Sequence, residues 1–328
     1  MSVDPHTHPR TALVIGATGS LGAAVAKALQ THGWQVRALH RDPKMARVHS
    51  MRVEDIEWIA GDALNGDDVV AAARGVDVIF HGANPPRYLK WRALAIPMLA
   101  NAIDAAVESG ARLIFPGNVY NFGPDAGPLV DERANQKPIS RKGVIRVEME
   151  RMLQDAAGAG GHSLIVRSGD FFGPYATSSW FGSAMIKPGK PIRVITPPGP
   201  VAVGHSWAYL PDLAETIARL ADIEASLSPF AVFHFEGHWL EPGEEMVSAI
   251  RRATGKPELP IKAFPWPLLY LAAPFSTFAR ELIEMRYLWN APLRLDNRKL
   301  LAVLGNEPHT PLDDAMAATL ASFKCPPF

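Results

Sequence analysis

The first half of the chain alternates between short, continuously apolar runs and segments with helical patterns. Runs this short and this apolar suit strands that are buried on both faces of a parallel sheet. The apolar runs cover 12–15, 34–39, 56–60, 76–81, 113–115 and 163–166. The predicted helices cover 20–32, 67–73, 93–109 and 141–157. Strict alternation predicts an α/β fold, a doubly wound parallel Rossmann-like sheet with right-handed crossovers.

The pattern loosens after Gly173, where prolines cluster in "TPPGP" and "PWP". Five tryptophans also fall in this half, at positions 180, 207, 239, 266 and 289, and we expect most of them in the core. We interpret this half as a smaller, mixed lobe laid over the ligand edge of the sheet. The expected division is a tail over 1–10, a sheet domain over 11–173 and mainly a substrate lobe over 174–328, with part of the chain returning to the sheet domain.

The composition argues against several classes of partner. The chain has 33 Lys+Arg and 33 Asp+Glu, so no overall field recruits nucleic acid. The single Cys325 excludes an intramolecular disulfide and fits a reducing compartment. Residues 1–10 lack the apolar core of a signal peptide, and prolines break the apolar region 264–278, which is shorter than the ~20 residues that span a bilayer. We expect a cytoplasmic protein that binds neither nucleic acid nor membrane.

The segment "TALVIGATGSLGAAVAKAL" has glycines at 16, 19 and 22, between a buried strand and a helix. The first glycine permits a tight turn, the second lets backbone amides approach a pyrophosphate, and the third allows close packing of helix on strand. A helix N-terminus adds partial positive charge. The alternative is a purely structural turn. The residues expected to contact a dinucleotide here are Gly16, Ala17, Thr18, Gly19, Ser20, Leu21 and Gly22.

The end of the second strand, "VRALHRDPKM", bears on the choice of cofactor. An acidic residue there holds the ribose of NAD, and a basic one accepts the 2′-phosphate of NADP. Arg41 and Lys44 favour NADP, because guanidinium suits bidentate phosphate contact, whereas Asp42 keeps NAD open. Arg41 as a plain solvated surface charge is the competing interpretation.

The next strand ends supply further candidate contacts. Asp62, followed by Ala63, stands where a carboxylate can accept a hydrogen bond from the adenine amino group. The small residues Gly82, Ala83 and Asn84 leave space for ribose and nicotinamide, although such residues are common in any turn. Gly117, near the end of the fifth strand, completes the expected cofactor contacts.

Together these segments resemble the extended short-chain dehydrogenase/reductase family, which contains sugar-nucleotide epimerases and dehydratases. The resemblance spans nearly the whole chain. It is carried by "GATGSLG", "AGDAL", "FHGAN", "LIFPGNVYNFGP", "VRSGDFFGP", "WAYLPDLAE" and "LRLDNRKLLAVLG", in the family's order. It implies a nicotinamide dinucleotide cofactor, a small-molecule substrate in the C-terminal lobe, and a homodimer formed through helices of the first domain.

The chain departs from this family at the catalytic positions. Aligning the fifth strand places Asn118 at the family's catalytic Ser or Thr and Phe122 at the Tyr of its Tyr-Gly pair. On the following helix, Gly143 falls at the Tyr position of the YxxxK pair and Val147 at the Lys position. Positioned acid–base catalysis is worth ~10²–10⁴-fold. Neither Gly nor Val can supply it, so we expect a non-standard catalytic site.

Four residues are the candidate replacements. Asn118 offers an amide to a substrate carbonyl, Tyr120 offers a phenol, and Arg141 and Lys142 offer positive charge. The competing interpretation is that Tyr120 packs and the two cations are solvated. Substrate contacts are expected from Asp170 and Phe171, at the exit of the next strand.

No metal site is expected, because His234 and His238 in "FHFEGHW" lack the helical HExxH order. Two hypotheses for function follow. The first is an NADP- or NAD-dependent oxidoreductase acting on a small, partly apolar carbonyl or conjugated substrate. The second is a non-catalytic dinucleotide sensor. An open pocket beside the nicotinamide favours the first, because a sensor can fill that space with side chains.

Overall fold

A computed structural model describes residues 9–49, 55–85 and 90–325. Its centre is a seven-stranded sheet with the order β10-β7-β5-β4-β1-β2-β3, in which every pair of neighbours is parallel. The strands are β1 (Thr11–Ile15), β2 (Gln35–His40), β3 (Glu57–Ala60), β4 (Val78–His81), β5 (Arg112–Asn118), β7 (His162–Ser168) and β10 (Phe230–His234). The prediction of a doubly wound parallel sheet is confirmed.

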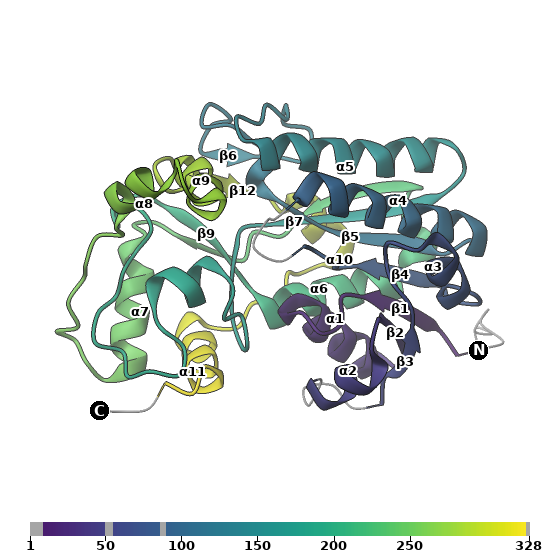
Figure 1. Cartoon of the computed structure of the whole chain (residues 1–328), viewed down its shortest axis with the longest axis horizontal. Helices are drawn as coiled ribbons and strands as arrows, with labels where there is room; N and C mark the ends of the chain where they lie inside the picture. Colours follow the sequence, from purple (N-terminus) through teal and green to yellow (C-terminus); the bar gives the residue numbers. More distant parts are fainter. Residues whose placement is uncertain (1–8, 50–54, 86–89, 326–328) are drawn as a thin grey trace.

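Helices cover both faces of this sheet, with α4 and α5 on one side and α1 and α6 on the other (Figure 1). The flanking helices are α1 (Ser20–Thr31), α2 (Pro43–His49), α3 (Gly66–Ala72), α4 (Trp91–Ser109), α5 (Arg141–Gly158) and α6 (Leu210–Asp222). The longer helices bury apolar residues against the strands; on α1 these include Val25, Ala26 and Leu29, which have no exposed area. Burial on both faces explains why the strands read as unbroken apolar runs.

Much of the second half of the chain, without α6 and β10, forms a mixed lobe beside the sheet domain, at the left of Figure 1. It holds a three-stranded sheet, β11-β9-β8, and a two-stranded sheet, β12-β6, begins in the first half. The strands are β6 (Leu129–Val130), β8 (Asp170–Phe172), β9 (His205–Tyr209), β11 (His238–Leu240) and β12 (Arg294–Leu295). The remaining helices are α7 (Glu244–Thr254), α8 (Trp266–Ala272), α9 (Thr277–Glu284), α10 (Arg298–Leu304) and α11 (Leu312–Ser322), of which α10 contacts β10 of the main sheet. Short single-turn helices are η2 (Val119–Asn121), η3 (Phe181–Met185), η4 (Glu224–Ser226) and η5 (Arg286–Trp289).

The strand order reverses direction between β1 and β4. The chain first builds outward through β2 and β3, then returns to the other side of β1 and builds outward again through β4, β5 and β7. In an open parallel sheet, the crevice outside the carboxyl ends of the strands at such a reversal is the ligand site. The loops after β1 and β4 therefore define the centre of the candidate site. Within the described residues, no helix is long and apolar enough to cross a membrane.

Candidate functional site

The loop between β1 and α1 is a tight cradle that tolerates no side chain at two of its glycines. Gly16 has φ +98°, and a Cβ built on it would lie 2.8 Å from the backbone nitrogen of Ala83. A Cβ on Gly22 would lie 2.2 Å from the carbonyl oxygen of Gly16. The helix start is also open, because Gly19 at the N-cap offers no side-chain hydrogen bond to the first-turn amides. These features fit a dinucleotide pyrophosphate at the N-terminus of α1.

The other residues predicted for this loop differ in exposure: some are buried and support the loop, and others are exposed to a ligand. Ala17 and Leu21 are buried and hold the loop against the core, whereas Thr18 and Gly19 form its exposed tip, with Ser20 half-buried beside them. The amide of Gly19 donates to the carbonyl oxygen of Gly16 at 3.0 Å, which closes the turn.

The basic residues after β2 lie at the surface. Arg41 is exposed and forms no ion pair or hydrogen bond with the residues that the structure describes, so its guanidinium is available to a ligand. Asp42 is otherwise engaged: its Oδ1 accepts the backbone amides of Lys44 and Met45, at 3.1 and 3.0 Å, and so caps α2. The Lys44 side chain is exposed in the first turn of that helix.

The turn after β4 adjoins the cradle at Gly16, whereas β3 lies two strands away from β1. The Asp62 carboxylate accepts the amide of Leu64 at 3.0 Å, and the carbonyl of Ala63 accepts from the Asn101 side chain. The amide of Gly82 donates to the carbonyl of Ile15 at 2.8 Å, which ties the β4 exit to the end of β1. Two of the residues predicted to contact the cofactor, Asn84 and Gly117, also have contacts within the protein.

Asn84 is one of these, since its Oδ1 accepts from the Trp91 indole. Gly117 is the other. It is buried within β5, where a Cβ would lie 2.6 Å from the Cγ of Arg167. Both positions therefore carry packing constraints that a small or amide side chain satisfies without any ligand.

Asn118 and Tyr120 stand where β5 ends and η2 begins. The Asn118 Oδ1 accepts the amide of Tyr120 at 2.9 Å, which caps η2. No described residue accepts a hydrogen bond from the Asn118 Nδ2, so this amide group can donate to a ligand. Tyr120 is buried among apolar side chains of the main core, an environment that matches the packing interpretation of its ring.

The start of α5 explains why no tyrosine stands at Gly143. A Cβ there would lie 2.2 Å from the carbonyl oxygen of Tyr120 and 2.6 Å from the Cβ of Pro138, so only glycine fits. Val147 is half-buried on the next turn. The backbone of η2 occupies the space into which a side chain at 143 would project.

Lys142 and Arg141 are both paired with α9 carboxylates. Lys142 is only 1% exposed, and its Nζ contacts the Glu281 carboxylate and the Glu284 Oε2, the latter at 3.1 Å. Arg141 reaches Glu281 at 3.0 Å from a side chain that is 68% exposed. The positive charge expected from these two residues is thus largely balanced by α9.

The sequence-based interpretation missed a histidine that pairs with Asp170. The His205 Nε2 lies 2.8 Å from the Asp170 Oδ2, and the imidazole stacks on the Trp289 ring, with centroids 4.0 Å apart and planes at 11°. Phe171, the other predicted substrate contact, is half-buried beside Asp170. His205 stands two residues before the motif "WAYLPDLAE", and a proton-exchanging side chain at that strand start was the available signal.

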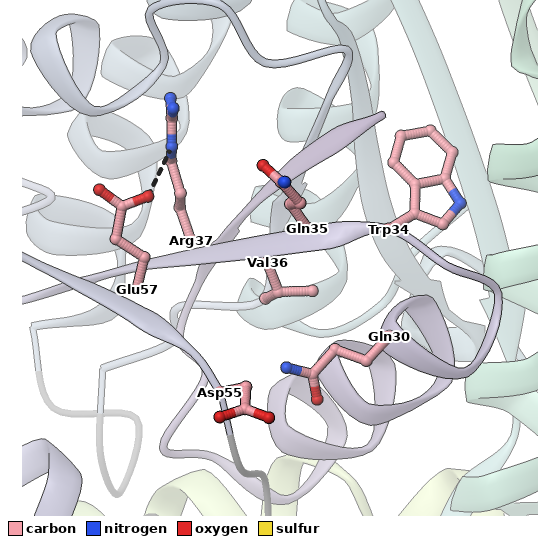
Figure 2. A pocket seen from close by; sticks show the side chains of 7 residues that line it. All are labelled: Gln30, Trp34, Gln35, Val36, Arg37, Asp55 and Glu57. Atoms are coloured by element: carbon pink, nitrogen blue, oxygen red, sulfur yellow. Dashed lines mark hydrogen bonds and ion pairs between the residues drawn. The ribbon is translucent and has the colours of Figure 1, made fainter. Parts of the chain in front are cut away.

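Asp170 and His205 line a small cavity where β5 and β7 end. Its walls are Val119, Gly169, Asp170, His205, Ser206, Leu288 and Leu293. The cavity measures about 10 Å³, close to the least space that holds one water molecule. A larger hollow, about 510 Å³, lies at the opposite edge of the sheet, where β2 and β3 begin (Figure 2). Residues predicted to hold the cofactor do not line it.

A second missed group is the cation Arg146 on α5. Its guanidinium donates to the carbonyl of Pro116 at 3.1 Å and lies 5.1 Å from the centroid of the Phe115 ring. His81, at the end of β4, stacks on that ring, and burial together with the Arg146 charge lowers the pKa of His81 to about 4. A neutral imidazole and a cation therefore stand under the crevice. Among the described residues, no group of three or more His, Cys, Asp or Glu side chains is placed to hold a metal ion.

Comparison with known proteins agrees with this geometry. Residues 9–126 match the NmrA-like family. An NmrA-like family domain-containing oxidoreductase, notA from Aspergillus sp. (strain MF297-2), is 37% identical over 141 residues, which cover 42% of this chain and 41% of that protein. Another, FrzB from Cladobotryum sp., is 28% identical over 134 residues, which cover 39% of this chain and 38% of that protein. The match thus spans about two fifths of the length of these relatives.

The NmrA-like match covers the cradle and the sheet edge, whereas structural similarity extends over the whole chain. The UDP-glucose 4-epimerase of Bifidobacterium longum, solved with NAD⁺ and UDP, superimposes with a TM-score of 0.73 at 15% identity, covering 94% of this chain and 97% of that one. The expected resemblance to epimerases and dehydratases is confirmed in the fold.

Proposed function

We propose that this protein is an NAD(P)-dependent oxidoreductase acting on a small, partly apolar carbonyl or conjugated substrate. The cradle carries the proposal, because Gly16 and Gly22 exclude any side chain beside an uncapped helix start at the reversal of strand order. The oxidoreductases FrzB and notA share sequence with this part of the chain, which supports the same conclusion.

Several loops and side chains would hold the dinucleotide. The loop 16–22 receives the pyrophosphate, the turn 82–84 and Gly117 flank the ribose and nicotinamide, and Asp62 with Ala63 stands by the adenine. Arg41, with Lys44, contacts a 2′-phosphate, so we propose NADP as the preferred cofactor, with NAD as the alternative. When bound, the nicotinamide supplies or accepts a hydride.

The substrate is proposed to lie beyond the ends of β5 and β7. The Asn118 Nδ2 donates to its carbonyl oxygen, with Tyr120 beside it. Arg141 and Lys142 fix the position of α9 over this region, and Asp170 and Phe171 line it from the lobe. Leu288 and Leu293, which border the same cavity, suit an apolar portion of the substrate.

Cofactor titration followed by a turnover screen tests this function. We expect NADPH, and more weakly NADH, to change nucleotide fluorescence on binding. The NADPH complex is then mixed with a panel of aldehydes, ketones and enones while nucleotide absorbance is followed. Oxidation by any member supports the proposal, whereas failure to bind either nucleotide contradicts it at the cradle itself.

The cavity volume favours a second candidate, a non-catalytic dinucleotide sensor. The space at the strand exits, about 10 Å³, is close to the least that holds one water molecule, and a sensor can fill the rest of this region with side chains. In a sensor, bound nucleotide would set the position of the C-terminal lobe for a partner. Tight nucleotide binding with no oxidation across the panel, together with a nucleotide-dependent change in lobe protection by hydrogen exchange, would favour this candidate.

We also propose a homodimer formed through helices of the sheet domain, working in the cytoplasm. The lone Cys325 fits a reducing compartment. Light scattering coupled to size exclusion should give twice the mass of the 35.6 kDa chain. A single-chain mass at micromolar concentration would exclude the dimer.

A further inference from the structure

The cavity where β5 and β7 end holds a histidine whose orientation is fixed from several sides. Asp170 holds the His205 Nε2 at 2.8 Å, and both side chains are largely buried, at 13% and 10% exposure. Trp289 stacks on one face of the imidazole, and Trp207 contacts its edge with centroids 5.0 Å apart. A carboxylate on one ring nitrogen and aromatic walls leave the imidazole a single direction in which to act.

The second ring nitrogen of His205, Nδ1, is the one that remains able to exchange a proton with a ligand. None of the residues in 9–49, 55–85 and 90–325 forms a hydrogen bond with it, whereas Nε2 is committed to Asp170. His205 lines the cavity together with Val119, the neighbour of Asn118. An imidazole held by a carboxylate at one nitrogen and open at the other is the arrangement that enzymes use for general acid–base catalysis.

The other proton-bearing groups near this edge are less suited to that role. The Lys142 Nζ is enclosed by Glu281 and Glu284. The Tyr287 hydroxyl donates to the Phe122 carbonyl at 3.1 Å, and burial raises the pKa of Tyr287 to about 12. Imidazole is the side chain best suited to give and take protons near neutral pH, and of the residues lining the cavity only His205 carries one.

We propose that His205 is the catalytic acid–base residue of this site and that Asp170 positions it. The inference rests on the proposed oxidoreductase function. In the reductive direction, a bound reduced nicotinamide dinucleotide would supply the hydride that the carbonyl carbon gains, and the C=O π pair would move to oxygen. The oxygen would take the proton from Nδ1 of the imidazolium form of His205, whose other proton, on Nε2, is held by Asp170. The carbonyl would become an alcohol, the dinucleotide would be left oxidised, and the neutral imidazole would take up a proton from solvent.

The cavity has room for about one oxygen atom, so on this proposal it would receive only the carbonyl oxygen. The carbon skeleton would lie on the cofactor side and displace Leu288 and Leu293. The Asn118 Nδ2 would then donate to the same oxygen as Nδ1. This assigns the site two donors for the oxygen in place of the family's Ser/Thr and Tyr.

His205→Gln tests the proposal, with His162→Gln as the matched control, since His162 is an exposed residue at the opposite end of β7. We expect NADPH affinity within about twofold of wild type for both variants. Single-turnover oxidation of NADPH by benzaldehyde or cyclohex-2-enone should slow by ~10²–10⁴-fold in His205→Gln only. Asp170→Asn, which keeps the side-chain shape, should slow it about tenfold or more and serves if His205→Gln fails to fold.

A readout without turnover completes the test. In a complex of the protein with oxidised NADP and cyclohex-2-enone, the ¹⁵N resonance of the His205 Nδ1 should shift, whereas that of His162 should not. A wild-type rate in His205→Gln, or an unchanged Nδ1 resonance at saturating enone, overturns the assignment of His205. Absence of oxidation in wild type itself overturns the proposed function and this assignment with it, so the two failures are distinguishable.

Discussion

We propose that single side chains decide which dinucleotide the cradle accepts. Arg41 is exposed and lacks a partner among the described residues, whereas the carboxylate of Asp42 is used to cap α2. A free guanidinium favours a phosphate, and an engaged carboxylate is less able to hold a ribose. Arg41→Gln should therefore weaken NADPH binding about tenfold, or ~1.4 kcal/mol.

NADH binding is the internal control for this variant, because NADH lacks the 2′-phosphate and its affinity should change by less than twofold. Both values come from one fluorescence titration series at a fixed salt concentration. An equal loss for the two nucleotides would mean that Arg41 supports the loop rather than reads the phosphate, and no loss for either would leave it a surface charge.

The cradle was predictable from the sequence because its constraints are local. Gly16 and Gly22 are required because side chains there would collide with the loop itself or with the neighbouring turn after β4. The spacing of the glycines in the sequence indicates this requirement. The pairing of His205 with Asp170 and Trp289 was not predictable, because the fold brings these residues together from separate segments. The pairing of Lys142 with Glu281 and Glu284 could not be predicted either, because these residues are also far apart in the sequence.

Among the described ion pairs that join two helices, those of α5 with α9 are the most buried. Lys142 is enclosed with Glu281 and Glu284, so Lys142→Met would leave two largely buried carboxylates close together with only the exposed Arg141 as a counter-charge. Breaking a buried pair on one side is strongly destabilising. We expect a loss of about 3 kcal/mol in the free energy of unfolding, measured by urea denaturation at pH 7.

Arg141→Gln is the matched control, since Arg141 meets the same two carboxylates from an exposed position. Its loss should be at most ~1 kcal/mol, as is usual for surface ion pairs. Equal losses in the two variants would contradict the special role of Lys142. If Lys142→Met instead keeps its stability but loses turnover, Lys142 acts on the substrate directly.

The longer helices were predictable because their periodic patterns are local, and α1, α4 and α5 begin within two residues of the predicted positions. The short α2 was not predicted. It spans Pro43–His49 and depends on the cap that Asp42 provides. The sequence analysis expected part of the chain to return to the sheet domain without saying which part. β10 pairs with β7, a contact between distant segments that periodicity does not show.

For the molecule as a whole, buried histidines should make stability depend on pH. Burial lowers the pKa of His81 to about 4, aided by the Arg146 charge, and that of His234 to about 3, aided by Arg167. Burial also lowers the pKa of His238 to about 4, with His309 adding to the effect. All three stay neutral in the folded state at pH values where the unfolded chain binds protons.

The sign of the effect follows from this difference in proton binding. As the pH falls from 6.5, the ordinary histidine pKa, to about 4, these histidines bind protons in the unfolded chain but not in the folded one. The free energy of unfolding therefore falls as the pH falls. Each histidine adds up to ~1.4 kcal/mol per pH unit. His32 acts in the opposite direction: burial opposes its charge, but hydrogen bonds to Asp222 and Glu215 outweigh burial and raise its pKa. Its stabilising contribution is complete below pH 6.5 and is lost only above that value.

Urea denaturation between pH 6.5 and 5 tests this prediction in the window before the carboxylates titrate. The wild-type free energy of unfolding should fall across it, with a slope of several kcal/mol per pH unit at its steepest. His238→Leu removes one of the three buried histidines and should reduce that slope by about one third. His162→Gln, at an exposed site, should leave the slope unchanged. A flat wild-type profile would mean that these histidines are protonated in the folded state, and their buried environments would then have to open to water as the pH falls.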